Sequence, residues 1–240
     1  NEIWDKLVLN SVDGTIFHTS EYLKSINDID YKFLLLKYKG TLRAGFLILL
    51  NKNSNNEIIK HHQIIYSGVI FSQTKGIRKT KIISDSFVLL TELSNYLEKN
   101  YKKISFCLSP SIKDIRPFKW HNYGEKDRRY QIEVRYTTQI VLDESIMNSK
   151  SGNNLFGNLE PVRRYSVRKA IKGNAKFDFV PNIEEAMLHY KNMMKPYWEE
   201  LNSLDDLINT IGKSLNILKE KNLLKTCNVY NENNALSYIV

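Results

Sequence analysis

The sequence predicts an α/β protein of two domains, each built around a sheet of mixed strand directions. Three observations lead to this prediction. Strand-like runs and one amphipathic helix alternate in the first half, a Ser-, Asn- and Gly-rich stretch divides the chain, and a second set of strands and helices follows. With 240 residues, of which 42% are hydrophobic and 11% aromatic, the chain has enough apolar side chains for a sizeable core. We therefore expect domains at residues 1–150 and 151–240.

The first half predicts a β-β-β-α-β order. Two apolar runs joined by Gly40-Thr41-Leu42 indicate a hairpin, and an Asn-rich turn separates that hairpin from further strands. Apolar residues at every third or fourth position then indicate a long helix. The expected elements are strands over residues 31–39 and 43–50, one or two strands within 57–72, a helix over 84–100 and a buried strand over 103–108.

Residues 129–142 alternate with the strand period and form the last expected strand of the first domain. Residues 143–158 are rich in Ser, Asn and Gly, and this composition sets the expected domain boundary. The inward-facing side chains of the strand are expected to be Ile132, Val134, Tyr136, Ile140 and Val141.

The second half is expected to begin with a helix, since Pro161 suits a first helical turn and Gly173 suits a helix end. Pro196 is expected to kink or break the first of two later helices. After the first helix we expect, in order, a strand over residues 176–180, helices over 183–201 and 204–221, and a hairpin of 223–230 with 235–240. The last apolar strand would leave an open sheet edge, so we expect the second domain to continue beyond it.

The formal net charge is +9, which favours a polyanionic partner such as a phosphate, a nucleotide, tRNA or an anionic membrane surface. The alternative is a solvated, lysine-rich surface that binds nothing. Cys107 and Cys227 lie far apart without metal-ligand spacing, which indicates buried thiols in a reducing compartment. No apolar run is long enough for a membrane span and no signal peptide is visible, so we expect a cytoplasmic protein.

A basic segment begins at Arg163 and places six cations, with no acidic residue, between positions 163 and 176. On a helix, Arg164, Arg168 and Lys172 follow at i, i+4 and i+8 and share a face. Like charges at this spacing repel one another, which a bound anion relieves, and the planar guanidinium suits phosphate. The alternative is a solvated basic face near a domain junction. The candidate phosphate- or acceptor-binding residues are Arg164, Arg168, Lys169 and Lys172.

The segment at residues 114–123 follows the expected strand at 103–108 and gathers aromatic rings and cations in one loop. Pro117 fixes the backbone, Asp114 suits bracing of the turn, and the imidazole of His121 suits proton transfer near neutral pH. The simpler interpretation is that the rings pack and the loop caps the sheet. The candidate residues of an acceptor groove are Asp114, Arg116, Trp120, His121 and Tyr123.

These two segments, about forty residues apart and followed by a new α/β unit, resemble the Fem-type (FemAB-like) aminoacyl- and acyltransferases. The resemblance covers nearly all of the chain and includes the N-terminal region 4–23 and residues 135–143. It implies two GNAT-like domains. Because β-α-α-β-β is the first half of that fold, it also implies that the second domain is truncated at its third strand. The basic helix would join the domains and face the acceptor or tRNA.

The resemblance implies an N-acyltransferase of cell-envelope biogenesis. Such an enzyme transfers an acyl or aminoacyl group, with acyl-CoA or aminoacyl-tRNA as co-substrate, to an amine of a peptidoglycan or polysaccharide precursor. It binds no cofactor tightly, and its partners are a phosphate-bearing or lipid-linked acceptor and, as a further candidate, tRNA. The lack of a coiled-coil arm in the sequence slightly favours CoA as the donor. The alternatives are a non-catalytic phosphate- or RNA-binding module with the same fold, and an inactive relative.

No residue is assigned as catalytic. The sequence from Gln73 to Arg78 approaches a GNAT-type pyrophosphate loop, but Arg78 stands where a small residue would let phosphate approach the backbone. His61 and His62 lack a third ligand at suitable spacing, and neighbours in a strand point to opposite faces, so we expect no metal site. The sequence contains no nucleophile elbow, Walker loop or zincin motif. Acyl transfer between an activated ester and an amine needs none of these.

Overall fold

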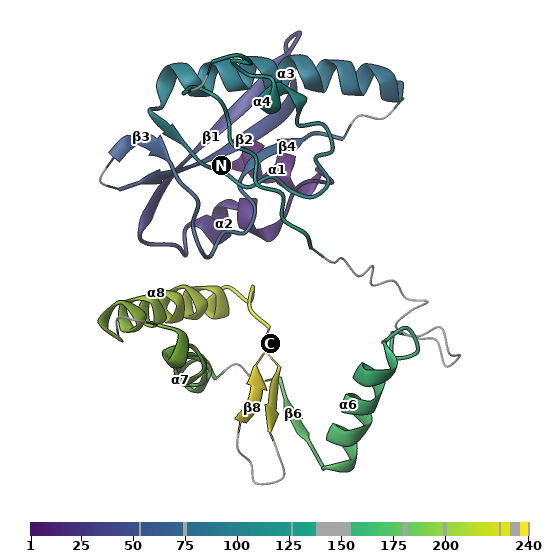
Figure 1. Ribbon diagram of the computed structural model, residues 1–240, viewed down its shortest axis with the longest axis vertical. Coiled ribbons are helices and arrows are strands. Elements are labelled where there is room, and N and C mark those ends of the chain that lie inside the picture. The colour runs from purple at the N-terminus through teal and green to yellow at the C-terminus, as the bar shows by residue number, and fades with distance from the viewer. Residues whose placement is uncertain are drawn as a thin grey trace. The chain divides into compact units, whose positions relative to one another are not determined.

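The computed structural model divides the chain into two compact units, unit 1 (residues 1–135) and unit 2 (residues 136–240), which are described separately (Figure 1). The mixed α/β character predicted from the sequence is confirmed. The expected domain boundary at residue 150 lies outside the described residues and stays a prediction. The structure describes residues 1–52, 54–73, 76–125, 127–137, 155–179, 182–198, 201–225, 227–230 and 236–239.

Unit 1 is organised around the long central strand β2. Strand β2 pairs in antiparallel fashion with β1 on one side and with β3 and β4 on the other, while β3 pairs in parallel with β5. The sheet therefore has mixed strand directions, as predicted. The elements of unit 1 are α1 (Glu2–Leu9), the 3₁₀ turn η1 (Ile16–His18), α2 (Ser20–Leu23), β1 (Ile29–Tyr38), β2 (Thr41–Asn51), β3 (Ser54–Ile58), β4 (Gly68–Phe71), α3 (Lys79–Asn100), β5 (Lys103–Ile104) and α4 (Arg116–Lys119).

Alternation of side chains along β2 supplies two cores, one on each face of the sheet. Leu47 and Leu49 join a cluster with side chains of α1 and α2, whereas Phe46, Ile48 and Leu50 join a cluster with α3. Figure 1 shows α3 along one side of the sheet and α1 and α2 on the other.

Helix α1 crosses the sheet closely at Gly45. A Cβ atom at this position would lie 2.5 Å from Trp4 Cζ3 and 2.8 Å from Leu7 Cδ2. A larger residue would therefore displace α1, which explains the glycine within an otherwise apolar strand.

The expected strand at 129–142 is wrong over its described part. Residues 129–137 form no strand, and Ile132, Val134 and Tyr136 are 42%, 68% and 95% exposed rather than inward-facing. Alternating apolar residues form a strand only beside a partner, and no described backbone pairs with residues 131–137. Ile140 and Val141 lie outside the described residues.

Two other elements of unit 1 differ in length from the prediction, and in unit 2 the strand expected at 223–230 is limited to Asn228–Tyr230. Helix α3 starts at Lys79, five residues earlier than position 84. The strand expected at 103–108 is a strand only over Lys103–Ile104, although the Ser67 amide still donates to the Cys107 carbonyl at 2.8 Å. The strand is therefore correctly placed but shorter than its apolar run.

The first described helix of unit 2 is the basic helix, and the described elements after it follow the predicted β-α-α-β-β order. Strands β6, β7 and β8 form an antiparallel sheet in that order. As expected, α7 stops just before Pro196, which lies in a 3₁₀ turn. None of the helices in the described ranges is long and apolar enough to cross a membrane. The elements are α6 (Pro161–Lys172), β6 (Lys176–Asp178), α7 (Ile183–Met194), the 3₁₀ turn η2 (Lys195–Tyr197), α8 (Leu201–Glu220), β7 (Asn228–Tyr230) and β8 (Leu236–Ile239).

Candidate functional site

The aromatic loop of unit 1 is braced at its start by an Asp114–Arg116 pair. Asp114 Oδ1 accepts from the Arg116 amide at 3.2 Å and from Nε at 2.8 Å, and Oδ2 accepts from Nη2 at 2.6 Å. The hydrogen bonds from Arg116 lower the pKa of Asp114 below its ordinary value. The Arg116 guanidinium carbon also lies 5.2 Å from the Phe87 ring centre and 5.6 Å from that of Trp120. Asp114 thus has the expected bracing role, and Arg116 is held by its neighbours.

His121 connects a hydroxyl and a carboxylate. Its Nδ1 lies 3.0 Å from Ser94 Oγ, and its Nε2 lies 3.0 Å from Glu98 Oε2. The arrangement has the chemical parts of a nucleophile, a base and an orienting acid. However, Ser94 is completely buried and its hydroxyl donates to the Thr91 carbonyl at 3.1 Å, so no substrate reaches it. We therefore assign His121 to the attachment of the loop to α3.

Glu98 is the point at which the loop is fastened to α3. Besides His121, its carboxylate accepts from Asn122 Nδ2 at 2.9 Å and forms an ion pair with Arg128. Partial burial alone would raise the pKa of Glu98. The hydrogen bond from Asn122 and the charges of Arg128 and His121 outweigh that effect and lower the pKa. The sequence analysis missed Glu98, whose one signal is a pair of polar residues, Ser94 and Glu98, within the apolar stripe of α3.

The fastened loop lines an open depression in the surface of unit 1. Two of the five candidate groove residues, Trp120 and Tyr123, line it and are 52% and 82% exposed. Asp114, Arg116 and His121 do not line it. Exposed rings together with cationic, anionic and amide groups suit a polar ligand that contains a ring. The lining residues are Lys119, Trp120, Tyr123, Asp127, Arg129, Tyr130 and Gln131.

The basic helix α6 of unit 2 has no buried side chain. Arg164 Nη1 donates to the Gly157 carbonyl at 2.8 Å, and the Arg168 guanidinium carbon lies 5.4 Å from the Phe156 ring centre. The two arginines therefore lie on one face of the helix, as the i, i+4 spacing predicted, and this face contacts the turn that precedes the helix. The Gly157 contact uses one N–H of Arg164 and the ring uses one face of Arg168, so both side chains keep N–H groups for an anion.

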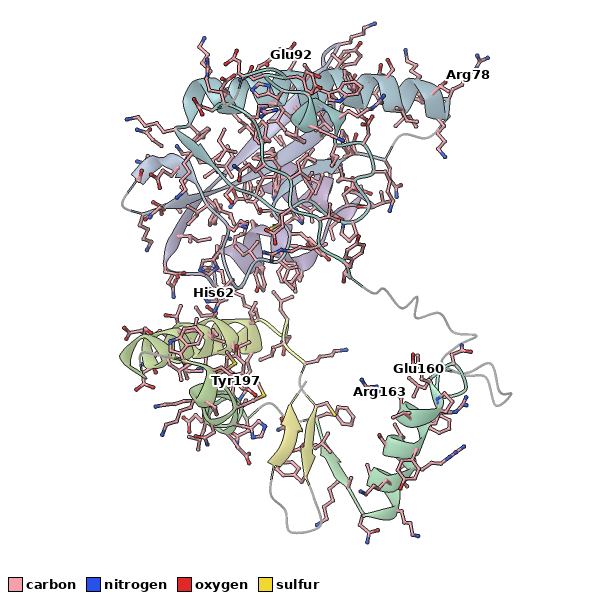
Figure 2. The ribbon with its side chains drawn as sticks, viewed as in Figure 1. His62, Arg78, Glu92, Glu160, Arg163 and Tyr197 are labelled. Carbon is pink, nitrogen blue, oxygen red and sulfur yellow. The ribbon has the colours of Figure 1, made fainter. Side chains whose placement is uncertain are left out.

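The lysines of α6 differ from its two paired arginines. In the part of the chain that the structure describes, the side chains of Lys169 and Lys172 make no hydrogen bond or ion pair, and both are exposed. Figure 2 shows the side chains of α6 as sticks, with Glu160 and Arg163 labelled at its N-terminal end. Helix α6 thus has two arginines, Arg164 and Arg168, that contact the preceding turn, and two lysines, Lys169 and Lys172, whose side chains form no ion pair with a described residue.

The two histidines at 61 and 62 are arranged differently from the prediction. Their ring centres lie 4.2 Å apart, because residues 61–64 form a turn closed by a bridge between His61 and Ile64 rather than a strand. The expectation that the two side chains point to opposite faces is therefore wrong. His61 Nε2 lies 3.1 Å from Asp28 Oδ2. No group of three or more His, Cys, Asp or Glu side chains suited to a metal ion occurs within the described ranges.

Comparison of the chain with protein-family models, with curated proteins and with solved structures gives no match.

Proposed function

We propose that the protein is a Fem-like N-acyltransferase, which transfers an acyl or aminoacyl group to an amine of a cell-envelope precursor. The observation that carries this proposal is the order of elements in unit 2. A basic helix, α6, is followed by β6, α7, α8, β7 and β8, and this β-α-α-β-β order supports the proposal of a GNAT-like second domain. The resemblance of the sequence implies the same order, with the basic helix at the same place.

The chemistry of such a transfer requires positioning more than a protein nucleophile. The amine nitrogen attacks the activated carbonyl, an amide bond forms, and the C–O bond of aminoacyl-tRNA or the C–S bond of acyl-CoA breaks. A proton passes from the amine to the leaving oxygen or sulfur. Holding the two reactants together provides most of the acceleration. In this proposal Arg164 and Arg168 of unit 2 bind a phosphate of the acceptor or donor. The depression beside Trp120 and Tyr123 in unit 1 is a separate candidate for binding a ring-bearing ligand.

A second candidate is a non-catalytic module that binds phosphate or RNA. One observation favours it. His121 lies within hydrogen-bonding distance of both a hydroxyl and a carboxylate, but it is buried between the loop and α3. An exposed basic helix without an accessible acid–base pair is sufficient for binding alone.

The two candidates are separated by a transfer assay. The purified chain is incubated with ¹⁴C-acetyl-CoA or ¹⁴C-aminoacyl-tRNA and with an amine-bearing UDP-linked sugar peptide, and label on the acceptor is measured. We expect labelled acceptor from one donor and at least about a tenfold lower rate in Arg164→Ala/Arg168→Ala. Lys79→Ala/Lys81→Ala removes two exposed cations from the first turn of α3 in unit 1 and is expected to keep the rate. Ligand binding without transfer from either donor would support the binding module instead.

A further inference from the structure

One face of α6 carries both cations and apolar side chains and is covered by nothing in the described structure. We define this open face as Val162, Tyr165, Lys169 and Lys172, which lie at i, i+3, i+7 and i+10 and therefore share one side of the helix. Val162 and Tyr165 are 71% and 67% exposed. Lys172, four residues after Arg168, lies at the border with the side of Arg164 and Arg168, which contacts the preceding turn, whereas Val162 and Lys169 lie away from that side.

We propose that the open face of α6 docks on an anionic membrane surface. The charge of this region fits such a partner, since residues 163–176 contain six cations and no acidic residue. Basic residues close to an anionic leaflet are attracted to its headgroups. Lys169 and Lys172 make no competing ion pair with described residues, so their charges are available to the headgroups.

The apolar members of the face explain why a lipid surface fits better than a nucleic acid. Val162, which is 71% exposed, is aliphatic and cannot stack on bases. Aliphatic side chains do enter the boundary between headgroups and acyl chains, and tyrosine is typical of that boundary. Lysine stems also extend along apolar surface while the ammonium reaches the headgroups.

The kind of cation on the open face also favours a lipid surface over a nucleic acid. Arginine forks suit specific phosphate recognition, but the two central arginines of α6 are partly engaged with Gly157 and Phe156. The open face presents lysines, which act as point charges and need no fixed phosphate geometry. A helix of 12 residues is about 18 Å long and lies in the plane of the interface without spanning it. This docking does not depend on the acyltransferase proposal, although it would bring the protein to a lipid-linked acceptor.

Vesicle co-sedimentation tests the proposal. The full chain is mixed with vesicles of phosphatidylcholine containing about 30% phosphatidylglycerol, or of phosphatidylcholine alone, at about 0.1 M salt. We expect binding to the anionic vesicles only. Lys169→Glu/Lys172→Glu is expected to weaken binding at least tenfold, and Val162→Ser/Tyr165→Ser several-fold. Lys79→Glu/Lys81→Glu in unit 1 makes the same charge change elsewhere and is expected to alter binding less than about twofold.

Three results would overturn the proposal. Equal losses in the α6 and α3 charge variants would show that diffuse charge, rather than the open face, attracts the vesicles. Unchanged binding of Val162→Ser/Tyr165→Ser would remove the apolar contact on which the argument depends. Loss of tRNA binding in Lys169→Glu/Lys172→Glu with vesicle binding intact would assign the face to RNA. Far-ultraviolet circular dichroism of each variant, matching that of the parent chain, verifies that these effects come from the surface.

Discussion

Units 1 and 2 share an order of two helices followed by an antiparallel hairpin. In unit 1 the helices are short and the strands long, whereas in unit 2 the helices are long and the strands short. In unit 1 the helices α1 and α2 have 8 and 4 residues and the strands β1 and β2 have 10 and 11. In unit 2 the helices α7 and α8 have 12 and 20 residues, whereas the strands β7 and β8 have 3 and 4. The same order of elements therefore supports a core built on a sheet in one unit and on a helix pair in the other.

The burial of side chains follows this difference. Every residue from Ala44 to Leu50 in β2 is buried, and both faces of the strand reach a core. In the described part of unit 2, the buried apolar side chains lie on α7 and α8, and α6 buries none. The comparison indicates that unit 1 contributes most of the stability, while α6 is a surface whose residues are available for binding.

Truncation of a buried side chain in the central strand β2 should cause the largest loss of stability. Phe46→Ala removes a completely buried ring between the sheet and α3, and we expect it to cost about 3–5 kcal/mol of unfolding free energy. Leu204→Ala removes a smaller, equally buried side chain from α8 and is expected to cost about 2–3 kcal/mol. Chemical denaturation of both variants gives the two values. A larger loss for Leu204→Ala would reverse the assignment of stability to unit 1.

Acid should destabilise unit 1 through His18. This side chain is completely buried, and burial lowers its pKa from 6.5 to about 4. Above pH 6.5 both folded and unfolded states are neutral at this residue. Between pH 6.5 and 4 only the unfolded state takes up the proton, which destabilises the fold by about 3 kcal/mol in total.

The pH dependence of denaturation, measured with substitutions at two histidines, checks this. His18→Asn keeps an acceptor near the position of Nδ1, which lies 2.9 Å from Thr15 Oγ1, and should flatten the curve between pH 6.5 and 4. His189→Gln in unit 2 is the matched control, a second histidine substitution measured in the same way. If both variants retain the full acid loss, His18 is not its source.

The fastening of the loop at Glu98 should have an intermediate effect. Glu98→Gln removes the charge that faces His121 and Arg128 and replaces one acceptor oxygen with a donor, so we expect a loss of about 1–2 kcal/mol. Glu92→Gln on the same helix is exposed and should change stability by less than about 0.5 kcal/mol. Equal stability of the two variants would show that the network around Glu98 contributes nothing.

Substitutions on α6 should have the smallest effect on stability. Arg164→Ala removes one hydrogen bond to the Gly157 carbonyl and should cost less than about 1 kcal/mol, and Lys169→Ala should be neutral. Thermal denaturation measures both. A loss above about 2 kcal/mol for either one would mean that α6 is part of a core and would remove the contrast between the two units.

The regular elements could be predicted well because their signals are local. Gly40 marked the hairpin turn, Pro161 and Gly173 marked the ends of α6, and Pro196 marked the end of α7. The strand at 129–142 was wrong over its described part because alternation predicts two faces but cannot supply a partner strand. A local sequence pattern therefore predicts elements whose ends are set by caps and turns. It does not predict a strand that needs a partner strand from elsewhere in the chain.

The candidate site could be predicted only in part for a similar reason. The shared face of Arg164 and Arg168 follows from helical spacing, and Trp120 and Tyr123 stood out as aromatic residues in a loop. The contact between His121 and Glu98 joins residues 23 positions apart, and spacing gives no sign of it. His121 was a candidate proton-transfer group with packing of the loop as the simpler alternative, and the tertiary contacts of His121 bury it.

The central claim is that α6 binds a phosphate-bearing ligand through Arg164 and Arg168 while unit 1 provides the stable scaffold. Calorimetric titration of the parent chain and of Arg164→Ala/Arg168→Ala with a UDP-sugar, tRNA and coenzyme A tests it most directly. We expect the affinity for at least one of these ligands to fall about tenfold for each guanidinium that is removed, since a charge-assisted hydrogen bond contributes roughly 1.5–3 kcal/mol. The unfolding free energy should stay within about 2 kcal/mol of the parent value. Equal affinities for all three ligands in the two proteins would contradict the claim.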